Sequence, residues 1–154
     1  MAQDLLSGER VLAFDLETTG ISTNSDRIVQ LALIGVDADE QPIHFETLVN
    51  PRIPIPYGAT NVHGIYDSDV KGEGDFSTIA DKAFELMDGS VIIGHNARNF
   101  DMKLINSEFL RLGKLPPKPK VVLDTLEVVR RLKLARPHNL GALCRRYGIS
   151  LENA

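Results

Sequence analysis

Two acidic residues interrupt what otherwise reads as a buried strand near the start of the chain. The segment VLAFDLETTG, Val11–Gly20, is an apolar run that contains Asp15 and Glu17. Residues two apart on a strand project from the same face, so these carboxylates point together while Phe14 and Leu16 enter a core on the opposite face. The chain must therefore bury one face of this strand and accommodate two neighbouring negative charges on the other.

These two charges either face solvent or bind a cation. Like charges at this spacing repel each other, and partial burial raises the cost of ionising both. A divalent cation would relieve the repulsion, because hard cations such as Mg²⁺ prefer carboxylate oxygens. The alternative is a solvated face of an edge strand that leads into a Thr-Thr-Gly turn. The pair alone is compatible with both readings.

Hydrophobic periodicity predicts three strands at the beginning of the chain. Runs rich in Val, Ile, Leu and Phe predict strands over 11–16, 28–36 and 43–49. The short connections between them suit antiparallel neighbours, because a parallel partner needs a longer crossover. The proline-studded stretch 50–60 cannot continue a central strand.

The period then changes to that of helices. Helical spacing recurs over 76–87 and 102–112, and short apolar runs predict strands at 91–93 and 121–123. An Asp-x-x-Glu start signal at Asp124 predicts a helix that reaches toward Pro137, and one more helix is expected over 140–147. The predicted fold class is α/β, with a mixed sheet of three antiparallel strands leading into parallel strands and helices on its faces.

Length and composition indicate one globular domain spanning 1–154. The hydrophobic fraction of 43% and charged fraction of 25% are ordinary for a water-soluble fold, so neither a disordered nor a membrane class is favoured. The single cysteine, Cys144, excludes an internal disulfide. No apolar run suffices to span a membrane and the first ten residues lack a signal peptide pattern, so the predicted location is the cytoplasm.

Charge is distributed unevenly along the chain. Residues 1–90 hold 16 of the 21 acids and five of the 17 bases, whereas residues 91–154 hold five acids and 12 bases. Such a division allows a basic face beside an acidic site, one arrangement for holding phosphates near metal ions. The alternative is a set of solvated helix faces with no partner.

A third acid follows the strand at 91–93. The segment VIIGHNARNFDMKLI passes from that strand through a loop into a helix with Asp101 in its first turn. An aspartate there commonly caps the helix or interacts with the positive end of its dipole. It could also complete a metal-binding cluster with the strand pair, and two such ions would support phosphodiester cleavage.

Four segments, in this order, resemble the motifs of the DEDD (DEDDh-type) exonucleases, the group that includes the proofreading (epsilon) subunit of DNA polymerase III and ribonuclease T. The segments are FDLETTG, NVHGI, GHNARNFD and LDTLEV…HNLGALCRRYGIS. The resemblance covers about residues 9–154. It implies a ribonuclease H-like fold and Mg²⁺- or Mn²⁺-dependent 3′–5′ exonuclease activity that releases nucleoside 5′-monophosphates from DNA or RNA.

The resemblance also implies roles for individual residues. The catalytic and metal-binding acids would be Asp15, Glu17 and Asp101, and the substrate-binding residues would be Thr18, Thr19, His63 and Asn96. A structural hydrogen-bonding role is the alternative for His63, and His95 together with Asn96 is expected to organise the loop that presents Asp101. Asp124 and Thr125 match a family pair, although helix capping explains Asp124. His44 and His138 are assigned structural roles, and no convincing zinc-ligand pattern surrounds His138 and Cys144.

Two features depart from the family pattern. The segment HNARNFD has one residue more before Phe100 than the usual His-Asn-x-x-Phe-Asp, which we interpret as a loop-length variant. The family's last motif, a general-base His followed five positions later by a fourth Asp, is absent from the 154 residues. The expectation is a domain truncated before that motif and weakly active or inactive, because loss of a general base costs about 10²–10⁴-fold in rate.

The sequence thus leaves two main hypotheses for function. The first is a metal-dependent 3′–5′ exonuclease in proofreading or repair that acts on a single-stranded or frayed 3′ end, with a DNA polymerase subunit as a candidate partner and no membrane. The alternative is a catalytically impaired nucleic-acid-binding or polymerase-associated module that retains the fold. A purely structural α/β domain with incidental acids is the third reading.

Overall fold

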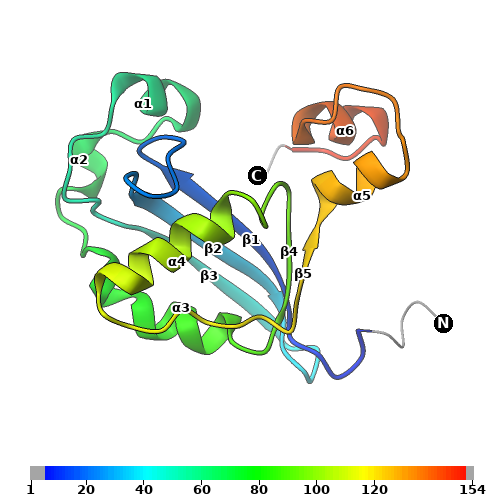
Figure 1. Ribbon diagram of the computed structural model, residues 1–154, viewed down its shortest axis with the longest axis horizontal. Helices are drawn as coiled ribbons and strands as arrows, with labels where there is room; N and C mark the ends of the chain where they lie inside the picture. Colours follow the sequence, from blue (N-terminus) through cyan, green and yellow to red (C-terminus); the bar gives the residue numbers. More distant parts are fainter. Residues whose placement is uncertain (1–5, 152–154) are drawn as a thin grey trace.

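A single mixed sheet organises the molecule (Figure 1), for which a computed structural model describes residues 6–151. Its strand order is β3-β2-β1-β4-β5. The antiparallel strands are β1 (Val11–Thr18), β2 (Ile28–Val36) and β3 (Pro42–Leu48), and β4 (Val91–Gly94) and β5 (Val121–Asp124) run parallel to β1. The predicted α/β class with three antiparallel strands leading into parallel ones is confirmed.

The predicted helices form, with shorter bounds at some ends. The first is divided into the 3-10 turn η1 (Phe76–Thr78) and α3 (Ala80–Met87), and the others are α4 (Asp101–Arg111), α5 (Thr125–Arg131) and α6 (Leu140–Arg146). The expectation that α5 reaches toward Pro137 is wrong, because Lys133 adopts a left-handed φ of 52°, which a continuing helix cannot contain. None of the helices in residues 6–151 is long and apolar enough to cross a membrane.

Two helices that the sequence did not predict lie between β3 and η1, the first beginning inside the proline-studded stretch 50–60 and the second after it. They are α1 (Tyr57–His63) and α2 (Asp67–Val70). Pro56 precedes α1 with φ −58°, a value suited to the start of a helix, and Gly64 ends α1 at φ 73°. The prolines therefore exclude a strand here, as predicted, while one of them also begins a helix.

The main core lies on one face of the sheet, beneath α3 and α4 (Figure 1). Alternation along β1 buries Leu12, Phe14 and Leu16 against this pair of helices. The aromatic rings of Phe76 and Phe109 meet edge to face at 5.1 Å within it. A smaller cluster around Val29 packs under α1 and α2. The opposite face of β1 carries Asp15 and Glu17 together with Val11 and Ala13.

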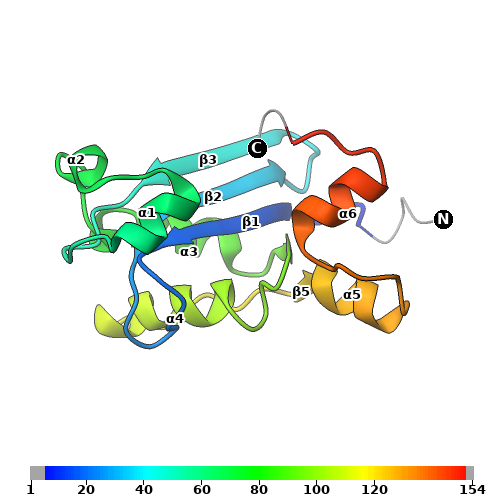
Figure 2. The same ribbon diagram turned by 90° about the horizontal axis from the view of Figure 1, so that it is seen from above.

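The sheet opens where β1 and β4 separate. Their parallel pairing runs only from Val11 to Ala13, although β1 continues to Thr18. Beyond that point the chain turns from β4 into the loop that leads to α4. In the view from above (Figure 2), α1 and α6 lie apart with β1 between them. The face of β1 that carries Asp15 and Glu17 therefore lies between two helical units.

Candidate active site

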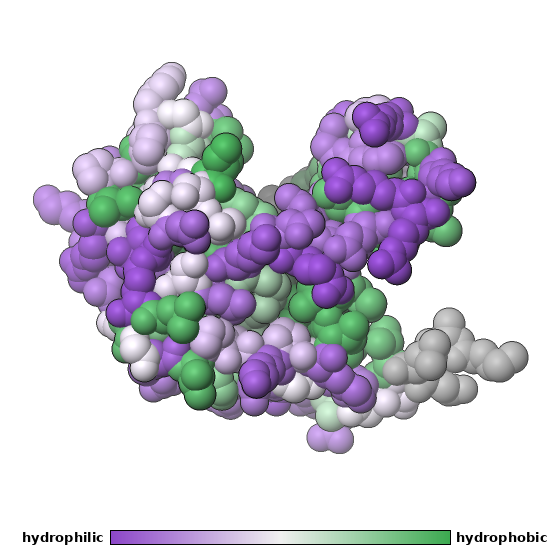
Figure 3. All heavy atoms as spheres, viewed as in Figure 1, coloured by the Kyte–Doolittle hydropathy of each residue, from purple (hydrophilic) through white to green (hydrophobic). Residues whose placement is uncertain are grey.

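The two strand acids stand together on the open face of β1. Asp15 and Glu17 alternate with the core residues Phe14 and Leu16, as the strand period predicted. Both line a cleft of about 630 Å³ that extends across the uncovered face of the sheet. Figure 3 shows the molecule hollowed between the α1–α2 side and the α5–α6 side. The cleft floor is therefore negatively charged.

Asp101 reaches this charge from the other side of the gap between β1 and β4. It is the first residue of α4 and only 5% exposed. Its pKa responds to the charges of Asp15 and Glu17, and backbone hydrogen bonding at Leu16 partly offsets them. The separation of β1 from β4 explains this contact, because it frees the β1 backbone beyond Ala13. The structure thus brings all three predicted acids into one electrostatic neighbourhood.

Burial and mutual repulsion disfavour ionisation of these acids. The pKa of Asp101 is raised to about 7, chiefly by burial and then by the negative charge of Asp15. Burial likewise raises the pKa of Asp15, which keeps solvent contact, and that of Glu17, to which Asp15 adds repulsion and His63 an opposing attraction. Shifted carboxylates gathered at a cleft are typical of functional sites.

The donor chemistry suits a hard divalent cation, but the spacing is not that of a finished ligand set. Carboxylate oxygens that repel one another are the groups that Mg²⁺ or Mn²⁺ would neutralise. In the described part of the chain, however, no three His, Cys, Asp or Glu side chains stand close enough to hold a metal ion together. The ligand role of Asp15, Glu17 and Asp101 remains a prediction.

His63 connects α1 to the end of β1. Its Nε2 lies 3.0 Å from the Thr18 carbonyl oxygen, and its Nδ1 accepts a hydrogen bond of 3.1 Å from the Ile65 N–H. Nε2 must then be the donor, which fixes the tautomer. The structural role considered for His63 is thus present, and its ring still lines the cleft beside Glu17.

The threonines after Glu17 are the last residue of β1 and the first residue of the loop that follows it. The Thr18 hydroxyl donates to the Gly20 carbonyl at 2.6 Å, and the Thr19 hydroxyl donates to Asp26 Oδ1 at 2.8 Å. Both residues are buried. Their predicted contact with substrate stays a prediction, and the structure adds that their hydroxyl groups hold the loop in shape.

Asp124 organises the loop before α4. Its carboxylate accepts hydrogen bonds from the backbone N–H groups of Asn96, Arg98 and Leu126, the last as the N-cap of α5. This agrees with the capping interpretation of Asp124. The hydrogen bonds from Asn96 and Arg98 also hold the loop that contains the extra residue. Asn96 adopts a left-handed φ of 59° within that loop.

His95 joins the same loop to the last two helices. Its Nδ1 lies 2.9 Å from the Thr125 hydroxyl oxygen, and its Nε2 lies 2.9 Å from the His138 carbonyl oxygen. Gly94 precedes it at a tight crossing, where an added Cβ would lie 2.7 Å from the Ala97 Cβ and 3.0 Å from the Phe14 oxygen. The organising role predicted for His95 is therefore visible in its contacts.

Sequence reasoning missed several residues that line the cleft. Gln30, Ile34, His44 and Glu46 extend it over β2 and β3, and Leu140 of α6 closes its other side. Strand alternation places these β2 and β3 residues on the open face, so that signal was available. The approach of Leu140 depends on a distant tertiary contact for which the sequence carries no local sign.

Comparisons with known proteins agree with this geometry. An exonuclease family model, that of RNase T, matches residues 12–154. DNA polymerase III PolC-type of Caldanaerobacter subterraneus subsp. tengcongensis is 39% identical over 127 residues, which cover 82% of this chain and 9% of that protein. The PolC-type polymerase of Clostridium perfringens is 32% identical over 146 residues, or 94% and 10%. The chain spans about a tenth of the length of these curated relatives.

Solved structures share the fold. Exonuclease I superimposes with a TM-score of 0.80 at 23% identity, covering 94% of this chain and 36% of that one. Exonuclease X in complex with 5′-overhanging duplex DNA gives 0.70 at 22%, covering 94% and 76%. Escherichia coli exonuclease I in complex with a dT13 oligonucleotide gives 0.78 at 22%, covering 94% and 37%. At such identities the likeness establishes the exonuclease fold alone.

Proposed function

This chain belongs to the exonuclease family, and from that premise we propose that it hydrolyses terminal phosphodiester bonds of DNA or RNA in the 3′–5′ direction. The products would be nucleoside 5′-monophosphates, and the ions would be Mg²⁺ or Mn²⁺. The substrate would be a single-stranded or frayed 3′ end. The similarity to PolC-type polymerases supports proofreading as the setting and a DNA polymerase as a candidate partner.

The observation that carries the proposal is the electrostatic coupling of three acids, two that line the cleft and one that is buried within reach of their charges. Asp15 and Glu17 line the cleft, and the pKa of the buried Asp101 responds to their negative charges. These residues would hold the divalent ions, which when bound supply an activated water and stabilise the leaving oxygen. Ionised Asp101 is needed for that task, so binding of the ions must overcome its raised pKa.

The other residues around the cleft position the terminal nucleotide in this proposal. The loop held by Thr18 and Thr19 and the α1 unit held by His63 would form one wall, and Asn96 would contact the substrate from the loop before α4. His63 and His95 already bond at both ring nitrogens, so neither is assigned as general base. No His in the 154 residues precedes an Asp by five positions. We therefore expect turnover by these residues alone to be about 10²–10⁴-fold slower than turnover with a general base.

The test is release of mononucleotides from single strands labelled at one end. We expect 3′–5′ degradation with Mg²⁺ or Mn²⁺, none with a chelator, and loss of release in Asp15→Ala. DNA and RNA strands assayed in parallel establish substrate preference. Asp39→Ala, an exposed turn aspartate, is the matched control. Unchanged release in Asp15→Ala would show that the proposed site is wrong.

A second candidate is a nucleic-acid-binding or polymerase-associated module without efficient turnover. It is favoured by the lack of a preformed three-ligand metal group within residues 6–151. In that case the protein would bind single strands with an affinity that Asp15→Ala leaves intact, and metal ions would release no mononucleotide at any enzyme concentration.

A further inference from the structure

We propose that the last helical unit binds the phosphodiester backbone of the single strand whose 3′ end lies in the acid-lined cleft. This inference rests on the proposed function and assigns a second contact region to the same substrate. The region, named here the basic arm, is residues 128–150, which contain six bases and no acid. The bases are Arg130, Arg131, Lys133, Arg136, Arg145 and Arg146.

These six side chains are exposed and carry uncompensated charge. Within the described residues, no carboxylate forms an ion pair with any of them. By contrast, Arg27, Arg98, Lys114 and Lys120 each pair with an acid elsewhere in the fold. Exposed cations that the protein leaves unpaired are available to an external polyanion.

The basic arm lies next to the acid-lined cleft. Its hollow, of about 520 Å³, is lined by Arg130, Arg136, Pro137 and His138. The cleft is lined by His95, whose Nε2 bonds to the His138 carbonyl oxygen at 2.9 Å. One hydrogen-bonded pair of residues therefore separates the two hollows. A nucleic-acid strand that leaves the cleft past His95 would reach the basic arm directly.

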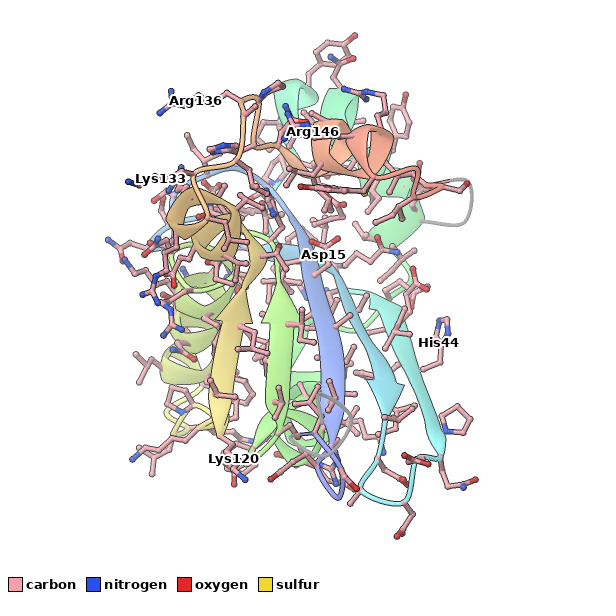
Figure 4. The ribbon with its side chains drawn as sticks, turned by 90° about the vertical axis from the view of Figure 1, so that its right-hand side faces the viewer. Asp15, His44, Lys120, Lys133, Arg136 and Arg146 are labelled. Carbon is pink, nitrogen blue, oxygen red and sulfur yellow. The ribbon has the colours of Figure 1, made fainter. Side chains whose placement is uncertain are left out.

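Figure 4 shows the same relation from the side. Lys133, Arg136 and Arg146 lie toward the end of the sheet near Asp15, whereas Lys120 lies at the opposite end. These three charges of the arm thus lie toward the same end of the sheet. A strand with its terminal phosphate among the acids would gain attraction to the arm for its preceding phosphates.

The composition of the arm suits the binding of phosphate groups. Five of its six bases are arginines. A guanidinium group can donate two parallel hydrogen bonds to one phosphate and remains charged at any working pH. These contacts carry no base specificity, so they would favour a substrate regardless of sequence.

The proposal is tested by binding, which does not depend on turnover. Fluorescence anisotropy is measured with a long labelled single strand and with a labelled dinucleotide, over a series of salt concentrations. In Arg130→Ser/Arg136→Ser, the affinity for the long strand should fall by about tenfold and the salt slope should decrease by about 1.4, the value for two lost phosphate contacts on a single strand. The dinucleotide affinity should not change.

The matched control removes two charges elsewhere. Lys103→Ser/Lys118→Ser alters exposed lysines on α4 and before β5, and it should leave the salt slope at the wild-type value. Arg130→Lys/Arg136→Lys should keep most of the slope, and thermal melts show that each variant is folded. Equal losses in both serine variants, no loss in the arm variant, or stronger binding to anionic phospholipid vesicles than to the strand would overturn the proposal.

Failure of this proposal and failure of the proposed function are distinguishable. Unchanged binding in the arm variant, together with Asp15-dependent release of mononucleotides, would contradict strand binding by the arm and support the exonuclease function. Salt-dependent binding through the arm, together with mononucleotide release that is unchanged in Asp15→Ala, would support the arm and contradict the proposed catalytic site.

Discussion

Arg27 donates two hydrogen bonds to the carboxylate of Glu108, from Nε to Oε1 at 2.6 Å and from Nη2 to Oε2 at 3.2 Å. Glu108 is 2% exposed, and Arg111 donates to it as well, at 2.9 Å. Arg111 also bonds to the Asn24 carbonyl oxygen. This cluster fastens the loop after β1, which begins at Thr19, to the C-terminal half of α4.

Removal of the charge on Glu108 should strongly destabilise the fold. In Glu108→Gln two guanidinium groups lose their shared partner, and breaking a buried pair costs about 3 kcal/mol. Both arginines keep roughly a quarter of their side-chain surface exposed, which moderates the loss. Urea denaturation measures it. Glu85→Gln, in an exposed pair with Lys82, should cost less than about 0.5 kcal/mol, and an equal cost would contradict the role of burial.

Asp101 should make stability fall as the pH rises in the absence of divalent ions. Its folded-state pKa of about 7 exceeds the ordinary value of 3.8. Between these values the folded protein binds more protons than the unfolded chain, so the free energy of unfolding decreases with pH across that window, by at most about 4 kcal/mol.

Urea denaturation at about pH 5 and about pH 8 checks this expectation. Asp101→Asn should flatten the difference, whereas Asp39→Asn should retain it. Added Mg²⁺ should restore stability at the higher pH in the wild-type protein and not in Asp101→Asn. A full pH dependence in Asp101→Asn would show that another group is responsible.

Loss of the charge on Asp124 should weaken both the loop before α4 and the start of α5. Its carboxylate accepts three backbone hydrogen bonds, and bonds to a charged group contribute about 1.5–3 kcal/mol. Asp124→Asn should therefore cost about 2 kcal/mol, measured by thermal or urea unfolding. Asp75, which caps η1 at the surface, provides the comparison, and Asp75→Asn should cost clearly less.

His63→Ala should reduce affinity at the terminal subsite. The change leaves the Thr18 carbonyl oxygen and the Ile65 N–H without their partner and releases α1 from β1. Calorimetric titration with a nucleoside 5′-monophosphate should show about a tenfold loss, the equivalent of one hydrogen bond. His44→Ala, at the far rim of the same cleft, should have little effect, so equal losses would refute a specific role for His63.

Local sequence signals predicted most of the fold. The strand over 28–36 was predicted with its observed bounds, and β4 and β5 extend one residue beyond the prediction. These elements carry runs of branched apolar residues with a clear period. The helix α1 escaped prediction because it begins inside the proline-studded stretch 50–60, and α2 escaped it because it has only four residues.

The site was predictable to a different extent. The common direction of Asp15 and Glu17 follows from strand period alone. The arrival of Asp101 beside them depends on where the pairing of β1 and β4 stops, and no local pattern encodes that point. The Arg27–Glu108 pair joins residues 81 positions apart, so it was likewise invisible. Secondary structure can be predicted from neighbouring residues in the chain, whereas contacts between distant residues are seen only in the folded protein.

Gly94 limits how this protein can be redesigned. Any side chain there would collide with Ala97 and with the backbone of the central strand, and so would push the following turn outward together with the acid that it delivers. A saturation library should find that position intolerant, although it contributes no chemical group to the reaction. The shape of the proposed site thus depends on the absence of a Cβ atom at one backbone position.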